Sequence, residues 1–98
     1  MLRFNENKFS IYKSIIIYAD LVDGDIRHEM EDEILKYGGF HSYHEAYGAL
    51  KKEVDELWNE IKSKEYNPDK IYKEAIQVTA MARKLALCAA YDISEELC

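Results

Sequence analysis

Acidic side chains recur at helical spacing in the middle of the chain, and their pattern suggests a cation site. Glu53, Glu56 and Glu60 follow one another at intervals of three and four residues. On a helix that turns about 100° per residue, with Leu50 at zero, they lie roughly 60° to 120° to one side of an apolar stripe. Carboxylates gathered on one flank repel one another unless a cation lies between them.

A second acidic position follows on the next helical segment. With Ile71 at zero, Glu74 lies roughly 60° and Gln77 roughly 120° from that segment's stripe, on the same rotational side. If the chain turns back near Tyr66, residues ten positions before and after the turn stand at the same height, because a helix rises about 1.5 Å per residue. The pattern predicts that four oxygen-bearing side chains converge: Glu53, Glu56, Glu74 and Gln77.

Oxygen ligands of this kind suit hard divalent cations. Mg²⁺ typically takes one or two carboxylates together with water and substrate phosphates, and Mn²⁺ accepts the same ligands. An acidic flank beside an apolar stripe is also typical of a solvated helix surface, where Lys52 and Glu56 would be ordinary exposed neighbours. Spacing alone leaves both interpretations open.

Two helices must position these side chains. The first carries Ala46, Leu50, Val54, Leu57 and Ile61, and the second carries Ile71, Ala75, Val78, Ala82, Leu85 and Ala89. Both sets follow the period of 3.6 residues that marks an amphipathic helix. The connection between them is short, so the two helices should run antiparallel. We predict a core hairpin over residues 43–90.

Local signals place the ends of these helices. Gly38 and Gly39 predict the end of a preceding helix, and Ser42 with Glu45 forms a capping-box pattern that predicts a start at about residue 43. Asn67 and Pro68 are suited to the N-cap and first position of the next helix. Residues 1–23 are less clear: apolar spacing favours helix, Gly24 should weaken, kink or split it, and the alternative is a strand over residues 14–18.

Length and composition limit the number of domains and the classes of protein to which the chain could belong. The 98 residues make one domain, with 48% hydrophobic and 33% charged residues. The net charge of −6 argues against binding to a nucleic acid polymer, which requires many basic side chains. The two cysteines fit neither a disulfide framework nor a zinc site. The longest apolar run is too short to span a membrane, so we expect a cytoplasmic protein.

The stretch from Lys36 to Ala89 resembles the MazG-like all-α nucleoside triphosphate pyrophosphohydrolases, particularly their short single-domain members. The segments KYGGFHSYHEAYGALKKEVDELWNEI and KEAIQVTAMARKLA carry the resemblance. That family typically has an EExxE motif on one helix and ExxD on the next, which together bind Mg²⁺. Glu53 and Glu56 match the last two acids of the first motif, and Glu74 matches the acid that opens the second.

Two positions depart from the family pattern. Lys52 stands where the first glutamate would be, and Gln77 stands where the aspartate would be. The resemblance implies metal ligation by Glu53, Glu56, Glu74 and the Gln77 carbonyl oxygen, and a catalytic role for Glu53 and Glu56. Glu60, on the same flank one turn further along, could compensate for the missing acids, whereas Asp55 points away. The missing negative charges should weaken the affinity for the cation.

The resemblance also implies an activity, partners and an assembly. The expected reaction is Mg²⁺-dependent hydrolysis of nucleoside triphosphates, either dNTPs or modified nucleotides, to monophosphate and pyrophosphate. Phosphate contacts are expected from Lys73, Arg83 and Lys84. The expected assembly is a homodimer or a dimer of dimers, which would complete a four-helix-bundle-type core. The alternative is a non-catalytic helical-bundle module that keeps the fold for interaction or nucleotide binding.

Overall fold

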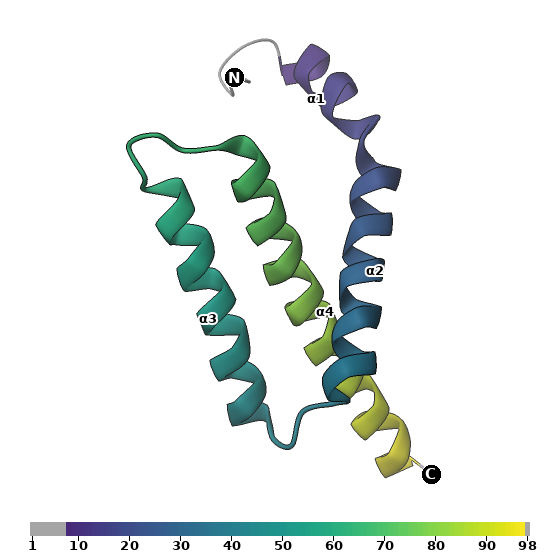
Figure 1. The fold of residues 1–98 in the computed structure, drawn as a ribbon. Coiled ribbons are helices and arrows are strands. Elements are labelled where there is room, and N and C mark those ends of the chain that lie inside the picture. The colour runs from purple at the N-terminus through teal and green to yellow at the C-terminus, as the bar shows by residue number, and fades with distance from the viewer. Residues whose placement is uncertain (1–7, 98) are drawn as a thin grey trace.

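The computed structural model describes residues 8–97 as four helices, so the first seven residues of the uncertain N-terminal segment lie outside the described part (Figure 1). The helices are α1 (Lys8–Ile16), α2 (Ala19–Tyr37), α3 (Tyr43–Ile61) and α4 (Pro68–Leu97). No strand occurs within residues 8–97, so the all-α prediction is confirmed and the alternative strand at residues 14–18 is wrong. None of these helices is long and apolar enough to cross a membrane.

The long helix α4 lies between its two neighbours. It packs against α3 as an antiparallel hairpin and against α2 on another face (Figure 1). These are the two extensive helix–helix contacts within residues 8–97. The predicted hairpin is confirmed, although α4 continues beyond residue 90 to Leu97.

The helix ends lie where the local sequence signals predict them, but one capping hydrogen bond has a different donor from the one expected. Helix α2 ends before Gly38, whose φ of 70° is accessible to glycine at little cost. The Ser42 hydroxyl accepts a hydrogen bond from the Glu45 amide at 3.1 Å. The Glu45 carboxylate accepts from the His41 amide at 3.4 Å, one residue earlier than a capping box requires. Before α4, the Asn67 side chain accepts from the Asp69 amide at 2.9 Å.

The interruption expected at Gly24 occurs earlier in the chain. Helix α2 runs through Gly24 unbroken, and the break lies at Ile17 and Tyr18, between α1 and α2. A glycine in a helix costs only about 1 kcal/mol and still forms its backbone hydrogen bonds. Burial of Ile26 and Met30 offsets that cost and keeps α2 continuous.

The packing face of α3 is rotated from the one that its apolar stripe predicts. Val54 and Ile61 are 43% and 45% exposed, whereas Glu53, Glu56 and Glu60 are half-buried. The interior of the hairpin is therefore partly acidic. This rotation places the glutamates, rather than the edge of the apolar stripe, in the space beside α4.

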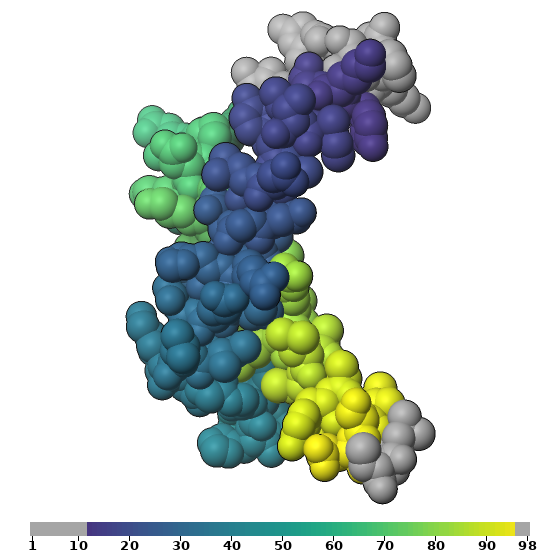
Figure 2. All heavy atoms as spheres, turned by 90° about the vertical axis from the view of Figure 1, so that its right-hand side faces the viewer, coloured from purple at the N-terminus to yellow at the C-terminus, as the bar shows by residue number. Residues whose placement is uncertain are grey.

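The buried core is small for a chain of this length. Within the described side chains, the buried apolar residues are Ile26, Met30, Ala46, Ile76, Ala80 and Met81. The radius of gyration is 16.2 Å, compared with about 13 Å for a compact domain of 100 residues. Figure 2 shows a curved outline, with the α1 end and the C-terminal part of α4 projecting to the same side.

Candidate functional site

Three carboxylates meet between α3 and α4. Glu53 and Glu56 lie one turn apart on α3, and Glu74 lies in the second turn of α4. One oxygen atom from each of the three residues lies within 4.8 Å of the other two. All three side chains are half-buried. The antiparallel hairpin thus brings together the three glutamates that the sequence pattern placed on a shared flank.

One oxygen of this group has no partner. The Oε2 atom of Glu74 is buried and accepts no hydrogen bond. Withdrawing a carboxylate oxygen from water without a hydrogen bond is costly, because the lost hydration is not replaced. A proton or a cation at this position would restore the missing interaction.

The closeness and burial of these acids raise the pKa values of Glu53 and Glu74. The pKa of Glu53 rises from 4.5 to about 7, first because burial removes it from water and then because of the charge of Glu56 and a hydrogen bond with it. The charge of Glu74 raises the Glu53 pKa further, whereas Lys52 lowers it. Burial, followed by the charges of Glu56 and Glu60, also raises the pKa of Glu74. The group therefore favours binding of a positive charge.

The spacing of the oxygens suits a divalent cation. Mg²⁺ bonds to oxygen at about 2.1 Å, so two ligands on opposite sides of the ion lie about 4.2 Å apart. An upper limit of 4.8 Å between the glutamate oxygens needs only small side-chain movements to meet this geometry. The unpartnered Glu74 oxygen would gain most from a cation, because it has no other partner.

Three charged residues near the glutamates, Glu60, Asp55 and Lys52, differ in their electrostatic effect on the group. Glu60 lies close enough for its charge to raise the pKa of Glu74, which agrees with a supporting position. Asp55 is instead paired with Lys51 at 3.0 Å on the exposed side of α3. Lys52 is exposed but still acts on Glu53 through its charge.

Gln77 forms a hydrogen bond with α2 that the residue pattern of α3 and α4 does not predict. Its side-chain amide donates a hydrogen bond to Glu29 of α2 at 2.9 Å. Both residues line a hollow of about 500 Å³ between α2 and the start of α4, together with Lys73. Gln77 therefore links α4 to α2, and Glu29 is an additional acid on this side of α4.

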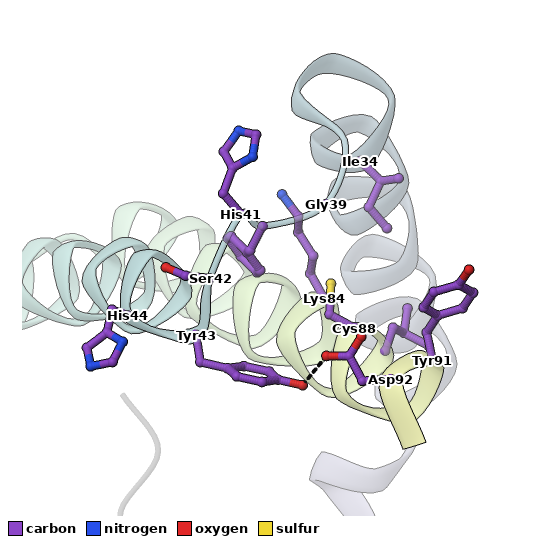
Figure 3. Close-up of a pocket in the computed structure, with 12 residues that line it drawn as sticks. Ile34, Gly39, His41, Ser42, Tyr43, His44, Lys84, Cys88, Tyr91 and Asp92 are labelled. Carbon is purple, nitrogen blue, oxygen red and sulfur yellow. Dashed lines mark hydrogen bonds between the residues drawn. The ribbon is translucent and has the colours of Figure 1, made fainter. Parts of the chain in front are cut away.

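Of the three predicted phosphate contacts, Lys84 needs correction. It is 2% exposed, and its ammonium lies 3.6 Å from the Glu33 carboxylate and 4.2 Å from the centre of the Phe40 ring. Figure 3 shows its side chain running beneath the α2–α3 connection. It lies ten residues after Glu74 on the same helix, which is about 15 Å. Lys84 holds the end of α2 on α4, whereas Lys73 and Arg83 remain exposed.

The buried stem of Lys84 should matter more for stability than its charge. We expect Lys84→Ala to lower the free energy of unfolding by about 2 kcal/mol or more, because it opens a cavity beneath Phe40 and leaves Glu33 unpaired. Lys84→Met keeps most of the volume and should cost clearly less. Urea unfolding of both variants measures the difference. Equal losses would show that the ion pair dominates.

The raised pKa of Glu53 gives stability a pH dependence of defined sign. Between pH 4.5 and about 7, the folded state holds a proton on Glu53 that the unfolded state has released, so the free energy of unfolding falls as the pH rises. After allowance for screening by solvent, we expect a loss of about 1 to 2 kcal/mol over this window without divalent cations. Glu53→Gln should remove that part of the slope. Parallel wild-type and variant slopes in thermal melts would contradict the assignment.

Comparison with known proteins adds no relative from which a function could be transferred. No protein-family model, curated protein or solved structure matches this chain. The chemistry of the site is therefore inferred from its residues and their geometry.

Proposed function

We propose that this chain is a divalent-metal-dependent hydrolase that cleaves nucleoside triphosphates to monophosphate and pyrophosphate. The observation that carries the proposal is the convergence of Glu53, Glu56 and Glu74, with one buried Glu74 oxygen left without a partner. Mg²⁺ or Mn²⁺ would be held by these three carboxylates, and its remaining positions would be open to water and phosphate oxygens. Glu60 would support the group from one turn away on α3.

The reaction requires a base, and Glu53 has the properties of one. A general base must accept a proton near the working pH, and without a cation the pKa of Glu53 is about 7. A bound cation would lower this pKa, so the Glu53 oxygen that does not hold the cation would act as the base. Water would attack the α-phosphorus as Glu53 takes its proton, and the bond to the pyrophosphate oxygen would break. The cation supplies charge neutralisation for the triphosphate. Lys73, which is exposed and lines the hollow towards α2, would contact a phosphate.

The resemblance to MazG-like pyrophosphohydrolases supports the choice of substrate. It covers Lys36 to Ala89 and places the same three glutamates in metal-binding positions. Lys52 and Gln77 depart from that pattern, and Gln77 is hydrogen-bonded to Glu29. A site with three acidic ligands and a neighbouring lysine should bind Mg²⁺ more weakly than one with the complete motif.

The proposal is tested by measuring pyrophosphate release from a panel of canonical and modified nucleoside triphosphates, each with Mg²⁺ or Mn²⁺. We expect release from at least one substrate, dependent on the metal and blocked by EDTA. Absence of release from the whole panel, at enzyme concentrations near the substrate concentration, would overturn the catalytic function.

We also propose that the chain assembles as a homodimer or a dimer of dimers. Large apolar side chains remain exposed along the outer face of α3 at intervals of seven, four and three residues: Tyr47, Val54, Trp58 and Ile61. Such spacing is that of a helix seam. Association would bury surface that the small core leaves in water. A monomer in light scattering at concentrations of about 100 μM would contradict this assembly.

The exposed apolar faces also favour a second candidate function. A non-catalytic helical-bundle module would keep the fold and the oligomer while Lys52 and Gln77 weaken the metal site. The two functions differ in one observable result. The module predicts an oligomer that releases no pyrophosphate, whereas the hydrolase predicts both properties together.

A further inference from the structure

The first helix presents apolar side chains to solvent. Tyr12, Ile15 and Ile16 lie at intervals of three and one, so they share one face of α1, and they are 63%, 46% and 48% exposed. Ile17 and Tyr18, in the turn that follows, are also exposed. A short helix with an exposed apolar face gains little stability by itself in water. This face requires a partner.

A groove of suitable character lies at the other end of the molecule. It has a volume of about 760 Å³ and is formed by the end of α2, the α2–α3 connection, the start of α3 and the C-terminal half of α4. Figure 3 shows Ile34, Cys88 and Tyr91 beside it, with the Tyr43 hydroxyl donating a hydrogen bond to Asp92. Leu87 also lines the groove and is 48% exposed.

Helix α1 and the end of α4 beside the groove carry opposite charges. Helix α1 contains Lys8 and Lys13 and no acid, whereas residues 92–96 contain three acids and no base. The one lysine that lines the groove, Lys84, is paired with Glu33. Helix α1 has no acid in its first turn, and α4 has no base in its last turn. Each of these two helix ends therefore lacks the side-chain charge that the helix dipole favours, which is an acid at the start and a base at the end. If basic α1 lay beside the acidic end of α4, each helix would supply the charge that the other lacks.

A chain cannot make this contact with itself. Helix α1 and the groove lie at opposite ends of α2 (Figure 1), whose 19 residues span about 28 Å. A second copy, related by a twofold axis near the middle of α2, would bring the α1 of each copy to the groove of the other. The curved outline in Figure 2 leaves both ends projecting on the same side.

We propose that α1 docks in the groove of a second copy of this chain, and that the exchange is reciprocal. Tyr12, Ile15 and Ile16 cover Leu87 and Tyr91, and the basic residues of the first helix lie near the acids at the end of α4. The inference rests on the homo-oligomer proposed above and is independent of hydrolysis. It assigns the groove an apolar, basic helix as its ligand.

Cysteine cross-linking tests this contact directly, because Cys88 already lines the groove. In a full-length chain with Cys98→Ser, the Ile16→Cys variant should form a disulfide-linked dimer rapidly with diamide. Adding Cys88→Ser should abolish that dimer. The matched control is Lys64→Cys, an exposed position in the α3–α4 turn at the same end of the molecule as α1. Cross-linking of Ile16→Cys no faster than Lys64→Cys would overturn the docking.

Light scattering separates this contact from the other proposals. Ile16→Asp should raise the dissociation constant of the dimer at least about tenfold, because one buried apolar side chain contributes more than 1.4 kcal/mol. An oligomer that is unaffected by Ile16→Asp overturns α1 docking and leaves association through α3 in place. A wild-type monomer overturns both contacts. Pyrophosphate release, measured separately, decides the hydrolase.

Discussion

Replacing Glu56 with glutamine should lower metal-dependent pyrophosphate release by about 10²- to 10⁴-fold, the range typical of losing an acid–base or ligand group. Glu56 is one of the three converging carboxylates, and its charge raises the pKa values of both Glu53 and Glu74. The substitution removes a ligand and also lowers the pKa of the proposed base. We expect the effect in kcat, measured with the substrate that the wild type cleaves best.

The control for this variant is Glu65→Gln, which changes an exposed acid in the α3–α4 turn. It makes the same chemical change outside the group of three carboxylates, so release should stay within about twofold of the wild type. Equal rates for the wild type and the Glu56→Gln variant would contradict the assigned site. A loss of folding is recognised by far-ultraviolet circular dichroism.

Replacing Glu74 with glutamine should stabilise the metal-free protein while removing its response to metal. The substitution removes a charge from a buried oxygen that has no partner, and its amide can donate a hydrogen bond to Glu56. We expect a gain of about 1 to 2 kcal/mol, or several degrees in Tm. The wild type should melt higher with Mg²⁺ because only the folded state holds the cation, and the variant should respond little.

This reversal distinguishes a metal site from an acidic helix flank. On a solvated flank, removal of one acid would change Tm slightly, and Mg²⁺ would act on wild type and variant alike. Glu95→Gln, at an exposed position near the end of α4, supplies the matched comparison. A Glu74→Gln variant that is less stable without metal would show that the carboxylate has a favourable partner in the folded state.

The sequence predicts the features that depend on neighbouring residues. The end of α2 and the starts of α3 and α4 follow from Gly38, Ser42 and the Asn67–Pro68 pair, since each acts through its own backbone or cap. The convergence of three glutamates also follows, because helical periodicity and a short turn fix both rotation and height. Local geometry was sufficient for these features.

The features that depend on α2 could not be predicted. The position of α2 on α4 depends on tertiary packing. This packing buries Lys84 beside Glu33 and allows the Gln77 amide to donate a hydrogen bond to Glu29. A basic residue on a helix is usually exposed, so nothing in the pattern around Lys84 indicates burial. The continuity of α2 through Gly24 has the same origin in packing.

The most direct measurement counts divalent cations at the three glutamates. In a titration followed by electron paramagnetic resonance, the full-length protein should remove one Mn²⁺ per chain from the free aqueous signal. Mg²⁺ should compete for the same position, and Glu74→Gln should weaken Mn²⁺ binding at least about tenfold. Absence of bound Mn²⁺, or binding that is unchanged in Glu53→Gln, Glu56→Gln and Glu74→Gln, would contradict a metal site between α3 and α4.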